Sequence, residues 1–128
     1  MGAEGTLYEG GMFRCELNFP RDYPLMPPTM RFTNVIPWHP NVYENGNVCI
    51  SILHPPGDDK YGYEQASERW LPVHTVTTIL LSVISMLADP NDESPANINA
   101  GKEWREDPAR FKQTVRRCVR RSQEECFD

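Results

Sequence analysis

The chain has 128 residues, which fits one domain and leaves no room for two. Its hydrophobic fraction of 39% is enough for a single core, and no apolar run approaches the roughly 18 residues of a membrane span. The formal net charge of −5 argues against nonspecific binding of nucleic acid by the domain as a whole. We therefore expect neither a membrane span nor a nucleic-acid partner.

The four cysteines show neither a C-x-x-C pair nor the spacing of a zinc site, so we expect no metal. Residues 1–7 lack the basic and apolar regions of a secretory signal. The sequence therefore predicts reduced thiols in the cytosol or nucleus, without a disulfide framework.

Two strands are predicted in the first third of the chain. Apolar and polar residues alternate over 12–19, which is typical of a half-buried strand. Cys15 falls on the apolar side of this pattern, so we expect it to be a small core residue. A rigid, proline-dense loop follows, and a second strand is predicted over 29–35, with Met30 and Phe32 on one face. Strand, turn and strand in this order indicate an antiparallel meander.

Three helices are predicted in the second half. The first covers 75–88, with Thr75 as its cap, and its wide apolar stripe predicts a central core helix. A shorter helix is predicted over 97–105, and Asp107 with Pro108 opens a last one. Strands first and helices later indicate an α+β fold, an antiparallel β-meander packed on the central helix with C-terminal helices. The stripe consists of Val76, Ile79, Leu80, Val83, Ile84 and Leu87.

Cys49 differs from the other cysteines because it lies in a turn-rich segment, whereas Cys118 falls on the apolar face of the last predicted helix. A partly exposed loop thiolate can act as a nucleophile on a macromolecular substrate. His39 and Asn41 lie ten and eight residues upstream of Cys49, and an asparagine amide can stabilise a developing oxyanion. These residue types alone leave open a cysteine peptidase, which would need a base within hydrogen-bond reach of the sulfur.

Five motifs follow one another along the chain: YEGG at 8–11 with the proline loop at 19–28, WHPN at 38–41, NGNVCISIL at 45–53, WLP at 70–72, and DPN at 89–91 with SPAN at 94–97. In this order they resemble the signature of the ubiquitin-conjugating enzyme family, and the match runs through essentially the whole chain. The polar stretch at 54–63 is similar to the acidic insertion of the G-type and Cdc34-like members. The segment from Lys102 onward is most similar to the G1 type.

The resemblance implies that Cys49 accepts ubiquitin from an activating enzyme as a thioester and passes it to a lysine of a protein substrate, with a RING-type ligase as helper. It implies no metal and no bound cofactor, because ATP is consumed by the activating enzyme. Enzymes of this subgroup tend to build lysine-linked, degradative ubiquitin chains. The expected location is the cytoplasm, with the nucleus or the cytosolic face of the endoplasmic reticulum as alternatives.

The resemblance also suggests roles for the residues around Cys49. Asn41 would donate to the oxyanion, or its amide would tie down the loop instead. His39 is interpreted as a buried structural residue rather than a general base. Ser94 stands where many members carry an aspartate that orients the incoming lysine. Asp58 and Asp59 would shield or steer the site, or would be ordinary solvated loop residues.

A surface for RING-type ligases is implied by Leu25 and Met26 in the first proline loop, together with Leu71 and Pro72 in the second. The alternative is that these side chains only pack their own tight turns and do not bind a ligase.

Members of the family begin with an amphipathic helix and a strand before the segment that contains Tyr8, and seven residues precede Tyr8 here. The resemblance therefore predicts a single core domain over 1–128 without that helix and strand. A noncatalytic or poorly charged binding module of the ubiquitin pathway is the alternative function.

Overall fold

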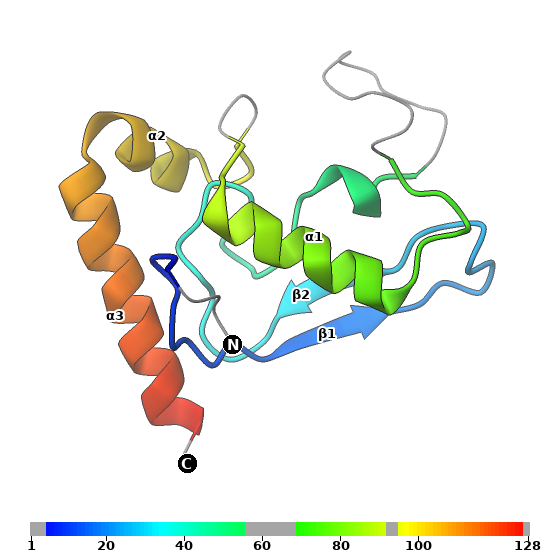
Figure 1. Ribbon diagram of the computed structural model, residues 1–128, viewed down its shortest axis with the longest axis horizontal. Coiled ribbons are helices and arrows are strands. Elements are labelled where there is room, and N and C mark those ends of the chain that lie inside the picture. The colour runs from blue at the N-terminus through cyan, green and yellow to red at the C-terminus, as the bar shows by residue number, and fades with distance from the viewer. Residues whose placement is uncertain (1–4, 56–68, 92–94, 127–128) are drawn as a thin grey trace.

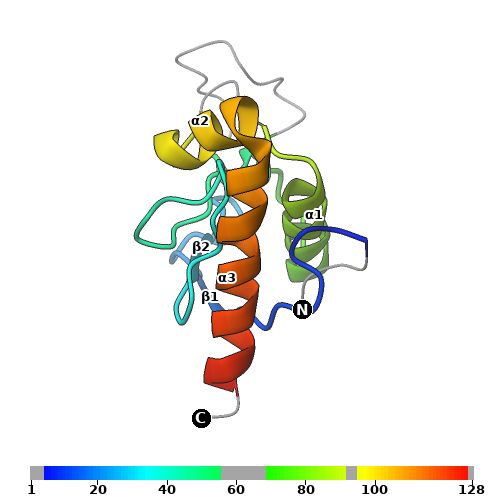
Figure 2. The same ribbon diagram turned by 90° about the vertical axis from the view of Figure 1, so that its left-hand side faces the viewer.

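The computed structural model describes residues 5–55, 69–91 and 95–126. Helix α1 lies across one face of the β1–β2 pair, and helices α2 and α3 lie together at one end of it (Figures 1 and 2). This is an α+β arrangement, as the order of the predicted elements indicated. The elements are β1 (Cys15–Asn18), β2 (Thr29–Phe32), the 3-10 turn η1 (Ser51–Leu53), α1 (Val76–Ala88), α2 (Ile98–Glu106) and α3 (Pro108–Cys126).

The two strands pair antiparallel, with Cys15 opposite Phe32 and Leu17 opposite Met30. Both strands are shorter than the alternating pattern predicted, but Met30 and Phe32 share a buried face as expected. The prediction of a buried Cys15 is wrong, because its side chain is exposed. The physical reason is that, among the described residues, β1 has a hydrogen-bonded strand on one side only, and three of its four residues are exposed.

The meander continues beyond β2 without forming a regular third strand. The Val48 amide donates to the Met30 carbonyl at 2.9 Å, and the Phe32 amide donates to the Gly46 carbonyl at 2.9 Å. Residues 46–48 therefore run antiparallel along the second edge of β2, where Arg31 and Asn47 form an isolated bridge. This pairing carries the chain to Cys49.

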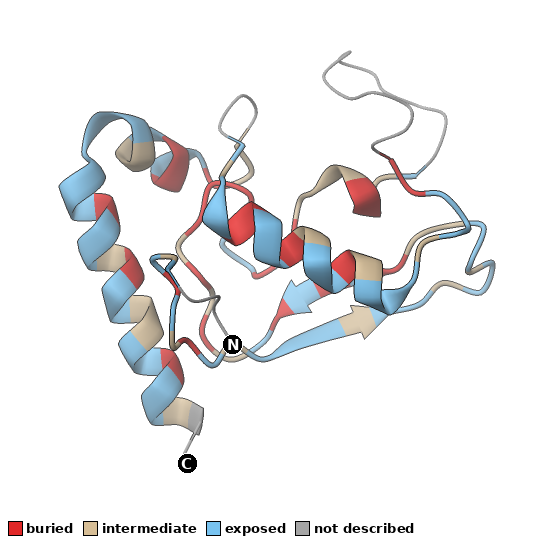
Figure 3. Cartoon of the chain, in the orientation of Figure 1, coloured by how far each residue is buried: buried red, intermediate tan, exposed pale blue. Residues whose placement is uncertain are grey.

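Helix α1 begins as predicted. Thr75 caps it, and Thr75 and Thr78 exchange the reciprocal hydrogen bonds of a capping box. Within the apolar stripe, Ile79, Val83 and Leu87 are buried against the core. The expectation that the whole stripe is core is wrong, because the two-stranded sheet covers only one side of the helix (Figure 3). Exposed stripe residues are Val76 at 40%, Leu80 at 41% and Ile84 at 41%.

Helices α2 and α3 also begin at the residues that the sequence indicated. The Asn97 side chain accepts the Ala100 amide at the start of α2, and the Asp107 carboxylate accepts the Arg110 amide at the start of α3. Cys118 is half-buried on α3, with its thiol 3.6 Å from the Ile36 carbonyl, in agreement with a packing role. The buried face of α3 comprises Phe111, Val115 and Ser122.

Candidate active site at Cys49

The backbone of Cys49 is held from two sides. Its amide donates to the Asn41 carbonyl at 2.8 Å, and Val42 and Val48 form an isolated bridge immediately before it. The preceding turn requires a glycine, because Gly46 has a φ of +98° and an added Cβ would lie 2.3 Å from the Phe32 carbonyl oxygen. The half-buried Cys49 thiol is thus presented by a fixed loop rather than by a helix or strand.

His39 lies beneath this loop and has no exposed surface. Its Nδ1 accepts the Asn41 amide at 2.9 Å, so Nε2 carries the proton and donates to the Met86 carbonyl of α1 at 2.8 Å. Burial lowers the pKa of His39 to about 4, despite an opposing effect of the Met86 hydrogen bond. His39 is therefore a neutral structural residue, as we interpreted it from the sequence. Both of its ring nitrogens already form hydrogen bonds.

Asn41 links the loop to the segment after α1. Its Nδ2 donates to the Asn91 carbonyl at 2.7 Å, and its Oδ1 accepts the Asn91 amide at 2.9 Å. The side chain is buried, with a residue exposure of 5%. The pairing uses one of the two amide hydrogens on Nδ2. The tethering role is thus visible in the structure, and donation to an oxyanion stays a prediction.

Two polar side chains that sequence reasoning missed lie at the Cys49 sulfur. His54 Nε2 is 3.7 Å from Cys49 Sγ. The Tyr43 hydroxyl also reaches the sulfur, and the pKa of Tyr43 is raised mainly by the charge of Cys49, with smaller contributions from burial and from a hydrogen bond to Cys49. Neither residue stood out in the sequence, because each approaches Cys49 through a turn of the backbone and belongs to no periodic pattern.

Ser94, Asp58 and Asp59 lie outside the described residues, so their expected roles stay predictions. A hollow of about 570 Å³ beside Tyr43 separates the turn at 43–45 from the start of α2. The hollow adjoins Tyr43, which contacts Cys49, but Cys49 itself is not among the residues that line it.

The two proline loops of the expected ligase surface are joined. Trp70 has no exposed surface, and its Nε1 donates to the Pro24 carbonyl at 2.8 Å. Leu25 is 65% exposed and Leu71 is 40% exposed, whereas Met26 is half-buried. Pro72 is exposed as well. The structure brings the loops of these residues together at the end of the sheet opposite α2 and α3 (Figure 1).

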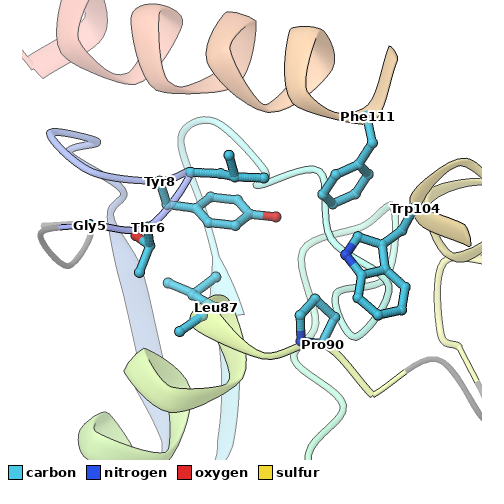
Figure 4. Close-up of a pocket in the computed structure, with 9 residues that line it drawn as sticks. Gly5, Thr6, Tyr8, Leu87, Pro90, Trp104 and Phe111 are labelled. Atoms are coloured by element: carbon cyan, nitrogen blue, oxygen red, sulfur yellow. The ribbon is translucent and has the colours of Figure 1, made fainter. Parts of the chain in front are cut away.

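A second cavity, of about 220 Å³, lies far from these loops, between α1, α3 and the N-terminal segment. Figure 4 shows the Tyr8 ring reaching into it between Leu87 and Phe111. Burial raises the pKa of Tyr8 well above its ordinary value, and its hydroxyl donates to the Trp38 carbonyl. No cysteine lines this cavity, so Cys49 is the better candidate site.

The described parts of the chain contain no cluster of three or more His, Cys, Asp and Glu side chains that could hold a metal ion. They also contain no helix that is long and apolar enough to cross a membrane.

Comparison with known proteins agrees with the motifs. Residues 1–119 match the family model described as ubiquitin-conjugating enzyme. The chain is 72% identical over 122 residues to ubiquitin-conjugating enzyme E2 15 of Schizosaccharomyces pombe, covering 95% of this chain and 72% of that protein. It is 65% identical over 124 residues to ubiquitin-conjugating enzyme E2 14 of Arabidopsis thaliana, covering 97% and 74% respectively. It is 57% identical over 122 residues to ubiquitin-conjugating enzyme E2 G2 of Homo sapiens, covering 95% and 73%.

Proposed function

Because the chain belongs to the ubiquitin-conjugating enzyme family, and its relatives include a G2-type enzyme, we propose that Cys49 is the residue that carries ubiquitin. The observation that supports this assignment is the fixed, half-buried thiol of Cys49, which stands in a polar loop with the side chains of His54 and Tyr43 in reach of its sulfur. Cys118, by comparison, packs on α3, and Cys15 lies on an exposed edge strand with no loop around it.

The proposed reaction has two steps. Cys49 Sγ attacks the thioester that joins ubiquitin to the activating enzyme, and the cysteine thiolate of the activating enzyme leaves. A lysine amine then attacks the new thioester carbonyl, an amide bond forms, and the Cys49 thiolate leaves. Asn41 is proposed to donate its second Nδ2 hydrogen to the oxyanion formed in this step.

The finer expectations from the resemblance belong to the same proposal. ATP is consumed by the activating enzyme, and this chain binds neither a metal nor a cofactor. The products are polyubiquitin chains of the degradative type, formed with a RING-type ligase that docks on Leu25, Met26, Leu71 and Pro72. Ser94, Asp58 and Asp59 assist the incoming lysine, and the site of action is the cytoplasm, the nucleus or the cytosolic face of the endoplasmic reticulum.

The decisive experiment incubates the chain with activating enzyme, ubiquitin and ATP. We expect an adduct that a reducing agent removes and that is lost in Cys49→Ala. Cys49→Ser should give an adduct that resists the reducing agent, because an oxyester replaces the thioester. A normal adduct in Cys49→Ala would refute the assignment, and the absence of any adduct on the folded wild-type chain would favour a noncatalytic binding module.

A further inference from the structure

The histidine beside the thiol is held in place by its backbone. The chain turns through η1 after Cys49, with Ile52 and Leu53 buried in the core. The His54 amide then donates to the Ser51 carbonyl at 2.9 Å, and the His54 carbonyl accepts the Trp70 amide at 3.1 Å. These contacts belong to the backbone, so the side chain at 54 can be changed without removing them.

The His54 imidazole therefore faces a thiol on a backbone that is itself fixed, because the Cys49 amide donates to the Asn41 carbonyl. The separation of 3.7 Å between Nε2 and Sγ is a hydrogen-bond distance for sulfur, and both side chains are half-buried. A nucleophilic thiol with a base in reach is the arrangement that activates cysteine for acyl transfer.

We propose that His54 is a catalytic residue that takes the Cys49 thiol proton when the thioester forms and returns a proton when the thiolate leaves. This inference rests on the proposed function of Cys49. In the first step the proton moves from Sγ to Nε2, Sγ bonds to the incoming carbonyl carbon, and the bond from that carbon to the donor sulfur breaks. The donor thiolate takes the proton from the His54 imidazolium, so charge and atoms balance.

The second step runs in the same manner. The neutral lysine amine bonds to the carbonyl carbon, the bond to Cys49 Sγ breaks, and the amine loses one proton to water. His54 takes this proton from the water and passes it to the leaving Cys49 thiolate, so that the imidazole ends neutral and the thiol is restored.

The other titratable groups near the thiol are less suited to this role. Tyr43 contacts Cys49, but its raised pKa keeps its hydroxyl protonated near neutral pH, so it is a hydrogen-bond donor rather than a base. His39 is neutral, and both its ring nitrogens are engaged in bonds to Asn41 and Met86. An imidazole ordinarily titrates near pH 6.5, which suits the transfer of a thiol proton at neutral pH.

The first test measures the thiol directly and does not require ubiquitin. Iodoacetamide alkylation of the peptide that contains Cys49 is followed by mass spectrometry from pH 5.5 to 8.5, in the wild type and in His54→Gln. We expect alkylation at pH 6 to be about tenfold slower in His54→Gln, because the thiolate is the reactive form and the variant lacks the base that takes the thiol proton. Exposed Cys15 is the internal reference.

His74→Gln is the matched control, because it removes an imidazole that stacks on Trp70 with ring centroids 5.5 Å apart. Its Cys49 alkylation profile should equal that of the wild type. Identical profiles for the wild type and His54→Gln would overturn the inference, and so would an equal loss in His74→Gln.

The second test measures chemistry. In His54→Ala, single-turnover charging by the activating enzyme should slow by about 100-fold, the lower end of the effect of a general base, and added imidazole should restore part of the rate. A variant rate equal to that of the wild type, or a loss that imidazole does not relieve, would overturn the proposal. If the wild type forms no thioester at all, the proposed function fails, while the alkylation profile still decides the pairing of Cys49 with His54.

Discussion

The side chain of Asn41 and the backbone of Asn91 exchange two hydrogen bonds, at 2.7 and 2.9 Å, and so join the Cys49 loop to the chain after α1. Removing the Asn41 side chain loses both bonds, each worth about 0.5–1.5 kcal/mol, so the expected cost is about 1–3 kcal/mol. We expect Asn41→Ala to lower the free energy of unfolding by this amount in urea titrations.

The same variant also tests catalysis. If Asn41 donates to the oxyanion, transfer of ubiquitin from Cys49 to free lysine should slow by about 100-fold while charging persists, measured at a temperature where the variant is folded. Asn41→Asp is the informative comparison, because its carboxylate still accepts the Asn91 amide but donates nothing. Its second carboxylate oxygen faces the Asn91 carbonyl oxygen, so we expect no more stability than in Asn41→Ala and equally slow transfer. Rapid transfer in Asn41→Asp would exclude the donor role.

His39 makes the stability of the fold depend on pH. Its pKa is about 4 in the folded chain and about 6.5 when unfolded, so the unfolded state binds more protons between these values. The stabilisation that comes from keeping His39 neutral is complete above pH 6.5 and is lost as the pH falls toward 4. The difference corresponds to roughly 3 kcal/mol.

Urea unfolding of the wild type and of His39→Gln over this pH range measures the effect. The free energy of unfolding of the wild type should fall more steeply on acidification than that of His39→Gln, whatever the absolute stability of the variant. Parallel curves would mean that His39 is not held neutral by its bonds to Asn41 and Met86.

Local patterns predicted the start of each helix, because a cap such as Thr75 or Asp107 acts within one turn of its own helix. The motif resemblance likewise singled out Cys49 as the candidate nucleophile, and this role stays a prediction. The exposure of Cys15 could not be predicted from alternation, since burial depends on what covers the sheet from elsewhere in the chain. His54 was missed for a related reason, because its approach to the thiol depends on the exact turn at η1.

Neighbouring residues of α1 offer a test of which face of this helix is core. Ile79 has no exposed surface, whereas Leu80 is 41% exposed. Ile79→Ala should lower the free energy of unfolding by about 2–5 kcal/mol, because it leaves a cavity in the core. Leu80→Ala should lower it by less than about 1 kcal/mol, and both substitutions give the same helix-favouring alanine. Equal losses in urea titrations would show that the exposed side of the stripe is buried in solution.

The two proline loops lie together at one end of the sheet, and we expect a ligase to bind there. Leu25 is 65% exposed, and its loop is fixed by the bond from Trp70 Nε1 to the Pro24 carbonyl. A large exposed apolar side chain on a rigid loop is suited to anchor a partner. We expect Leu25→Ala to weaken binding of a cognate RING-type ligase at least about tenfold in calorimetry, a loss of about 1.4 kcal/mol.

Charging of Cys49 by the activating enzyme should be unchanged in Leu25→Ala, because the substitution leaves the core intact. Ile98→Ala provides a matched control, since Ile98 is 70% exposed but lies at the start of α2, at the opposite end of the sheet (Figure 1). Trp70→Phe keeps most of the buried ring but loses the bond to Pro24, so it should weaken ligase binding through the loop geometry while Leu25 is still present. If Ile98→Ala weakens the ligase as much as Leu25→Ala, the docking surface is not at the proline loops.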